Sequence, residues 1–144
     1  MSWDIYVQDI PVAAKSISDM PEDFAPRPLG GRAEIITRIR EVVPTADFTS
    51  PSCGQIDGSG FSIEVSMGDQ EEVNSFAFHV RGGDLAALVV ADILRHLGFR
   101  AFDPNSPTGM FDLDRDPSAG LRRWRNYRDG VVCHFTHRFA RLEA

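Results

Sequence analysis

The segment from Val73 to Phe99 places the strongest constraint on the fold. Residues Phe76 to Val80 alternate between large apolar side chains and others, as in a half-buried strand. Arg81-Gly82-Gly83-Asp84 follows as a turn, and Leu85 to Leu97 carries apolar residues at helical spacing. The sequence therefore predicts a strand, a turn and a helix in succession, with both regular elements contributing to one core.

Similar patterns predict the elements that complete this core. Apolar and polar residues alternate in the strands, whereas the helices carry apolar residues on one face. Ile10 to Gly31 is rich in Pro and Gly and is predicted to be a surface connection, and Gln55 to Asp57 can form a short strand. The other predicted elements are strands at Trp3–Gln8 and Phe61–Met67, helices at Gly31–Val43 and Asp84–Leu97, a hairpin of Phe99–Phe102 with Met110–Leu113, and a short helix whose Leu121, Trp124 and Tyr127 face the core.

The order of these elements predicts an α+β fold. Strand, helix, strand, strand, helix, strand is the order of the ferredoxin-like split β-α-β arrangement, in which both helices cover one face of an antiparallel sheet. The C-terminal hairpin and helix would be added to this core. We expect residues 1–129 to form a single domain, and the pattern assigns no conformation to the tail at residues 130–144.

Composition and charge exclude several classes of protein. The 144 residues carry a net charge of −6, which disfavours nucleic acid as the main partner because that binding needs a cationic surface. The longest apolar run, Leu85 to Val90, is too short to span a membrane. No secretory leader precedes Trp3, so a cytoplasmic location is expected, and the sequence leaves open whether Cys53 and Cys133 pair.

Alternation in the predicted strands gathers several chemically active side chains on the sheet face turned away from the helices. Tyr6, Glu64, His79 and Arg81 belong to this face and could perform acid–base chemistry or hold a small anion. An equally simple interpretation is that one face of an antiparallel sheet is polar because water covers it. The closest pair, His79 and Glu64, would be neighbours only in one strand register.

The turn before the second long helix is a second, weaker candidate. Gly82 and Gly83 could present free N–H groups to an anion at a helix N-terminus, and Arg81 would add positive charge. Asp84 would occupy the same N–H groups as a helix cap, so an ordinary capped turn is the favoured interpretation. The sequence contains no phosphate-loop, dinucleotide-binding or metal-ligand motif, and we expect no cofactor and no metal.

Three segments also carry a resemblance. Met1 to Asp9, Glu41 to Phe48 and Phe76 to Gly83 resemble segments of a group of small uncharacterised bacterial proteins. The resemblance runs from Met1 to about Tyr127 and implies a bacterial cytoplasmic protein. It implies no activity, cofactor or catalytic residue.

The sequence leaves three functions open. The preferred one is a non-catalytic protein-interaction or binding module that contacts another protein or its own copy. The second is a small enzyme or small-anion-binding domain that uses His79, Glu64, Tyr6 and Arg81. The third is an acidic immunity or inhibitor protein that covers a cationic partner with the help of the acidic loop from Asp69 to Glu72. Convergence of the four side chains in a concave pocket would favour the second over the first.

Overall fold

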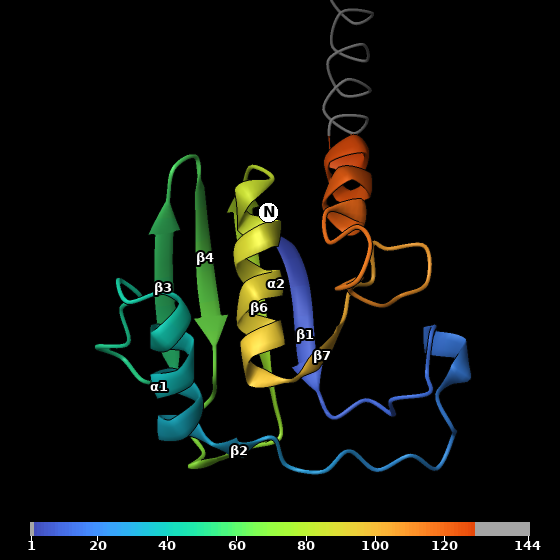
Figure 1. The fold of residues 1–144 in the computed structure, drawn as a ribbon, viewed down its shortest axis with the longest axis horizontal. Helices are drawn as coiled ribbons and strands as arrows, with labels where there is room; N and C mark the ends of the chain where they lie inside the picture. Colours follow the sequence, from blue (N-terminus) through green and yellow to red (C-terminus); the bar gives the residue numbers. More distant parts are fainter. Residues whose placement is uncertain (1, 129–144) are drawn as a thin grey trace, which may run out of the picture.

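A computed structural model describes residues 2–128 and shows a mixed α+β fold (Figure 1). Its elements are β1 (Trp3–Gln8), the 3-10 helix η1 (Ile17–Asp19), β2 (Gly30–Gly31), α1 (Arg32–Val42), β3 (Cys53–Gly58), β4 (Phe61–Ser66), β5 (Glu72–Val73), β6 (Ser75–Gly82), α2 (Leu85–Leu97) and β7 (Arg100–Phe102). Residues 119–128 are also helical. The strand, turn and helix predicted from Val73 to Phe99 correspond to β6, its turn and α2.

The main sheet has five strands in the order β3-β4-β6-β1-β7, and every neighbouring pair is antiparallel. The two long connections each contain a helix, and β6 and β7 flank β1 on either side. This strand order does not confirm the predicted ferredoxin-like arrangement, which has four strands. The chain has an additional full strand, β3, between α1 and β4.

The extent of β3 differs from the short strand predicted at Gln55 to Asp57. Only Ile56 supplies a large apolar side chain to the core face of this strand, and Gly54 occupies the other buried position. A Cβ atom at Gly54 would lie 2.3 Å from the ring of Phe48, so the phenyl ring of a neighbouring loop fills the space of the missing side chain. The apolar contribution therefore comes from outside the strand, and alternation within the strand is too weak to reveal it.

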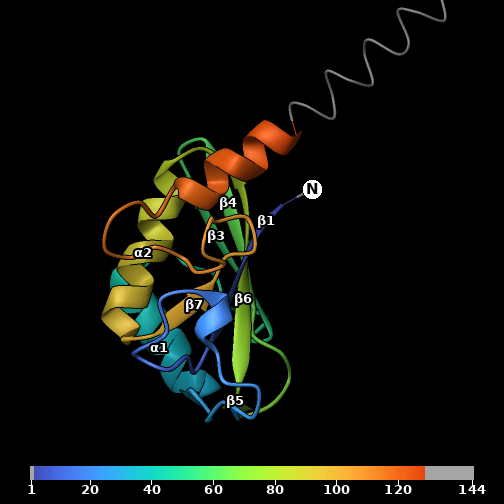
Figure 2. The same cartoon turned by 90° about the vertical axis from the view of Figure 1, so that its right-hand side faces the viewer.

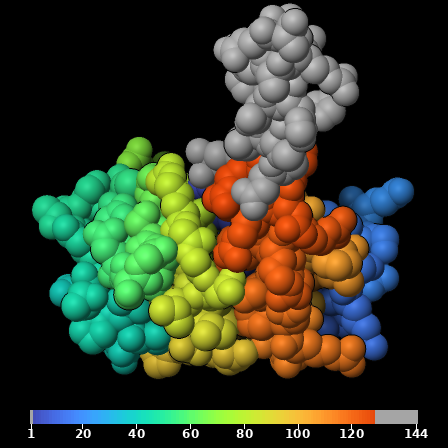
Figure 3. All heavy atoms as spheres, turned by 90° about the horizontal axis from the view of Figure 1, so that it is seen from above, coloured from blue at the N-terminus to red at the C-terminus, as the bar shows by residue number. Residues whose placement is uncertain are grey.

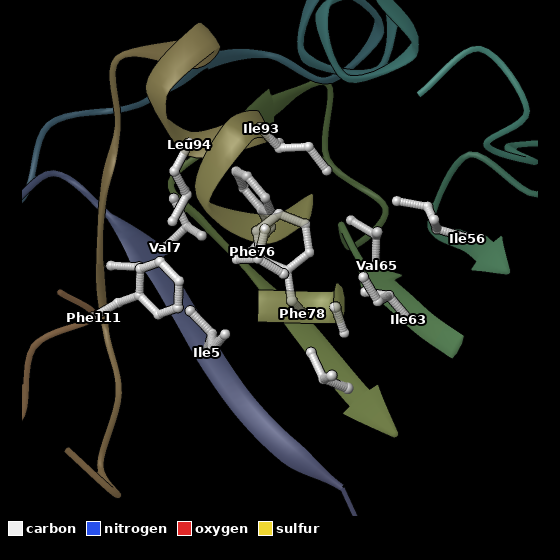
Figure 4. Packing of buried hydrophobic residues seen from close by; sticks show 14 of the residues in the cluster. Ile5, Val7, Ile56, Ile63, Val65, Phe76, Phe78, Ile93, Leu94 and Phe111 are labelled. Carbon is white, nitrogen blue, oxygen red and sulfur yellow. The ribbon is translucent and has the colours of Figure 1, made fainter. Parts of the chain in front are cut away.

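Both long helices pack on one face of the sheet (Figure 2). The core between these layers contains Ile5 and Val7 from β1, Phe78 from β6, and Ile93 and Leu94 from α2, all fully buried (Figure 4). The predicted alternation is confirmed, because inward residues are buried whereas their neighbours along each strand reach the opposite face. Burial of these side chains is the main stabilising contribution to the fold.

The helix at 119–128 lies beside α2 and closes the same core (Figure 3). Leu121 and Trp124 are buried, but Tyr127 is 65% exposed, so the prediction that Tyr127 faces the core is wrong. Each residue of an α-helix turns about 100°, so positions three apart drift by about 60° around the axis. Two such steps move Tyr127 away from the face that Leu121 presents.

Each outer strand of the sheet is partly covered along its free edge. A bridge joins Asp47 to Gln55 of β3, and another joins Met110 to Phe102 of β7. The predicted hairpin with Met110 to Leu113 is thus reduced to this bridge, at which Phe111 N donates to Ala101 O at 3.0 Å and Asp103 N donates to Gly109 O at 2.9 Å. In the part of the chain that the structure describes, no helix has the length and apolar character needed to cross a membrane.

Candidate functional site

The face of the sheet opposite α1 and α2 carries the predicted site residues, and we call it the open face. Its outward side chains come from alternate positions of the five strands. Asp4 lies opposite His79, and His79 lies opposite Glu64, so the register makes His79 and Glu64 cross-strand neighbours. The outward residues include Asp4, Tyr6, Gln8, Cys53, Gln55, Ser62, Glu64, Ser66, Ser75, Ala77, His79, Arg81 and Phe102.

Asp4 and His79 form the best-defined contact on this face. Nδ1 of His79 lies 2.7 Å from Oδ1 of Asp4, and the Ser2 hydroxyl donates to the same carboxylate oxygen at 2.6 Å. The side chains of His79 and Asp4 remain 29% and 34% exposed. A carboxylate in this position fixes the orientation of the imidazole, which suits the ring either to proton transfer or to a directed contact with a partner.

The Glu64 carboxylate accepts a hydrogen bond from Cys53 on the neighbouring strand β3. The Cys53 thiol donates to Oε1 of Glu64 at 3.4 Å, and this hydrogen bond, with burial and the carboxylate charge, raises the pKa of the thiol. A raised pKa keeps the exposed Cys53 in its thiol form at neutral pH, which disfavours it as a nucleophile. Cys133, its predicted possible partner, lies outside the described residues.

Tyr6 borders an open hollow of about 600 Å³ on the same face. Tyr6 is 43% exposed and Ile17 of η1 is 59% exposed, and both line the hollow together with Phe102 and Ala77. His79, Glu64 and Arg81 are not among its lining residues. The four residues predicted as a site therefore share one face but do not converge on this hollow.

The Gly82-Gly83 turn is hydrogen-bonded to the turn between β3 and β4. The Gly83 N–H donates to the Gly60 carbonyl at 3.0 Å, so this N–H already has a partner. Gly82 has φ of 109°, and a Cβ there would lie 2.2 Å from Gly60 O. This close approach explains the glycine at position 82, and because the Gly83 N–H is already bonded the geometry gives the predicted anion site no support.

Two neighbours of this turn also differ from the sequence-based interpretation. Asp84 makes no side-chain cap bond to α2, and its carboxylate instead accepts from Arg125 at 3.0 Å. The predicted capping role of Asp84 is therefore wrong. Arg81 lies opposite Ser62 with its side chain on the open face, whereas Gly83 continues into α2 on the opposite side of the sheet.

Sequence reasoning missed two features of the open face. It did not identify Asp4 as the partner of His79, although strand alternation puts Asp4 on the same face and an antiparallel pairing of β1 with β6 makes that contact possible. It also missed the hollow, whose wall includes Ile17 from a remote loop that no local pattern connects to the sheet. Comparison of the chain with protein-family models, curated proteins and solved structures found no match, so these residues are interpreted from their own geometry.

Proposed function

We propose that the protein is a non-catalytic protein-binding module whose contact surface is the open face. The flat distribution of Tyr6, Glu64, His79 and Arg81 is the observation that carries this proposal. Enzyme sites are usually concave and exclude water around the reacting groups, whereas protein contact surfaces are broad. Following the sequence resemblance, we place this activity in the cytoplasm of a bacterium.

The covered sheet edges support a contact through the face rather than through strand addition. A partner that adds a strand needs a row of unpaired N–H and C=O groups at a sheet edge. Backbone groups of Gln55 on β3 are bonded to Asp47, and the Ala101 carbonyl of β7 accepts from Phe111. The open face offers side chains from five strands without this obstacle.

The alternative of a small enzyme draws its support from the Asp4–His79 hydrogen bond. An imidazole held by a carboxylate can act as a general base, and a substrate would then have to lie directly against His79. The Cys53 thiol supplies no activated nucleophile nearby, because Glu64 disfavours its ionised form. We therefore favour binding over catalysis.

Site-specific photo-crosslinking in the source cell tests this proposal. A photoreactive phenylalanine analogue replaces Tyr6, and in a control it replaces Val12, which is 94% exposed and does not line the hollow. We expect a protein adduct of defined mass at position 6 that is absent at position 12. An adduct with twice the mass of the chain would identify a second copy as the partner.

Two results would count against the binding module. One is the absence of any protein adduct at position 6, and the other is the same set of adducts at positions 6 and 12. To exclude chance capture, the Tyr6 adduct is also examined after Ser75→Arg, which places a bulky cation at the rim of the hollow. An adduct of a real partner should diminish in that background.

A further inference from the structure

The hollow beside Tyr6 and the carboxylates around it together indicate the chemistry of a partner. We propose that the hollow receives a large apolar side chain from a partner protein segment, and that lysine or arginine residues beside this anchor contact the surrounding carboxylates. This inference rests on the proposed binding function of the open face. It names the class of partner, which is a cationic segment with an apolar anchor.

The apolar part of the surface is hollowed because small side chains lie next to large ones. Tyr6 of β1 lies opposite Ala77 of β6 on one side and Phe102 of β7 on the other, and Ala77 lies opposite Ser66 of β4. The small side chains of Ala77 and Ser66 form a low area beside the rings of Tyr6 and Phe102. Ile17 and the Met67-Gly68 segment complete the wall.

The hollow is large enough to receive a large side chain. Its volume of about 600 Å³ lies within the range of pockets that enclose small ligands, but it is open to solvent. Tyr6 and Ile17 expose apolar surface there, which a partner would favourably remove from water. An aromatic or leucine side chain within a larger contact fits these properties.

The polar part of the surface lies two residues farther along the same strands. Asp4, His79 and Glu64 follow from Tyr6, Ala77 and Ser66 at two-residue spacing, which corresponds to about 7 Å along a strand. The carboxylates of Asp4 and Glu64 therefore flank His79 beside the hollow.

Further carboxylates come next in the chain after two residues that line the hollow. Met67 and Gly68 line the hollow, and the exposed residues Asp69, Glu71 and Glu72 come directly after them in the chain. This loop is the one that the sequence associated with a cationic partner. A basic segment crossing the hollow would thus meet negative charge on both sides.

Two of the arginines near the hollow are bonded to backbone carbonyl groups. Arg100 donates to the carbonyls of Pro11 and Ala14, each at 2.5 Å, and Arg32 donates to the Gly68 carbonyl at 2.9 Å. Arg81 lies one step beyond His79 on β6, farther from the hollow. The five carboxylates named above outnumber these three arginines, and the net charge of −6 for the chain is also negative.

Selection from a random peptide library on phage tests this inference with the purified full-length protein as bait. We expect enriched peptides to combine an aromatic residue or leucine with lysine or arginine close by. For a representative synthetic peptide, Ala77→Arg should weaken binding by at least about tenfold, because the new side chain fills the hollow and repels the cation. Ser75→Arg at the rim is a second variant if Ala77→Arg fails to fold.

A matched pair of substitutions isolates the charge contribution. Glu64→Gln removes one carboxylate beside the hollow, and Glu34→Gln makes the same change on the exposed side of α1. We expect Glu64→Gln to weaken the peptide several-fold and to reduce the salt dependence of its affinity, whereas Glu34→Gln leaves both unchanged.

Several outcomes would overturn the cationic-anchor inference. They are enrichment of acidic or uncharged peptides, equal effects of the two glutamate substitutions, binding unaffected by both arginine variants, and failure to enrich any peptide. Concentration-dependent dimerisation through the open face would assign it to a second copy and would also exclude a distinct cationic partner. In each case a Tyr6 adduct from the cell would still support the proposed function, so the two failures are distinguishable.

Discussion

Asp103 is the one charged side chain that is buried among residues 2–128, with 1% of its surface exposed. Its Oδ1 accepts from the Trp3 indole N–H at 2.9 Å and from the Asn105 N–H at 3.0 Å. A Cβ at Gly120 would lie 1.7 Å from Oδ2, so the carboxylate sits directly against the first turn of the helix at 119–128. This single side chain connects β1, the turn after β7 and the C-terminal part of the core.

Burial of Asp103 makes the stability of the fold depend on pH. Desolvation raises the pKa of its carboxyl, and the hydrogen bonds from Trp3 and Asn105 together with the charge of Arg123 offset this effect only in part. Because the folded pKa is then above the unfolded value of about 3.9, the folded state binds the proton more tightly between the two. The contribution of Asp103 to stability therefore increases as the pH falls through this range.

Asp103→Asn tests this dependence, because the amide oxygen can still accept from Trp3 while the charge is removed. We expect the variant to gain more stability relative to the wild type at pH 7 than near pH 4, so its free energy of unfolding minus that of the wild type should be more positive at pH 7. Urea denaturation followed by circular dichroism at both pH values provides the comparison. A difference that is independent of pH, or one that grows as the pH falls, would contradict the assigned cause.

At the scale of elements, alternation and helical spacing were sufficient for most of the fold. β1, β4, β6 and α2 were predicted close to their observed bounds because each carries its own apolar pattern. β3 was only partly predictable, since Gly54 contributes no apolar side chain and the Phe48 ring fills its place. The fifth strand is therefore completed by a side chain from the preceding loop, which alternation within the strand does not contain.

The turn between β6 and α2 gives an element-scale prediction. Gly82 and Gly98 both have positive φ, of 109° and 73°, but only Gly82 approaches another backbone, at Gly60. Gly98→Ala should cost about 1 kcal/mol, the usual penalty for this backbone conformation. Gly82→Ala should reduce the free energy of unfolding by about 3 kcal/mol or more, because the added Cβ also pushes the turn after β6 away from the β3–β4 turn.

Thermal and urea unfolding of the two alanine variants measures this difference. The comparison uses the same substitution at two glycines with positive φ, of which only Gly82 approaches another backbone. Equal losses of stability in both variants would show that backbone conformation alone accounts for the glycines. In that case the packing of the β3–β4 turn against the turn after β6 would contribute little to the stability of the fold.

At the scale of the whole molecule, the sequence placed the candidate residues on a common face but could not describe its surface. The periodicity of two assigned Tyr6, Glu64, His79 and Arg81 to that face, and the register then decided which of them are neighbours. The hollow depends on η1 and on the segment after β4, whose positions are set by tertiary packing. The shape and charge of the contact surface are therefore properties of the assembled fold.

The helix at 119–128 tests how far the folded unit extends along the chain. Leu121 is fully buried in the core cluster, whereas Tyr127 on the same helix is 65% exposed. Leu121→Ala should reduce the free energy of unfolding by about 2–5 kcal/mol, the range for large-to-small changes in a core. Tyr127→Ala should change it by less than about 0.5 kcal/mol, because an exposed side chain loses little on truncation. Urea denaturation of both variants, followed by circular dichroism and by the combined fluorescence of the core residues Trp3 in the sheet and Trp124 in the helix, provides the test. A single transition shared by both signals would show that this helix unfolds with the sheet, as expected for one domain over residues 1–129. Equal stability of the two variants, or a separate early change in fluorescence, would instead show that the helix is not part of the cooperative unit.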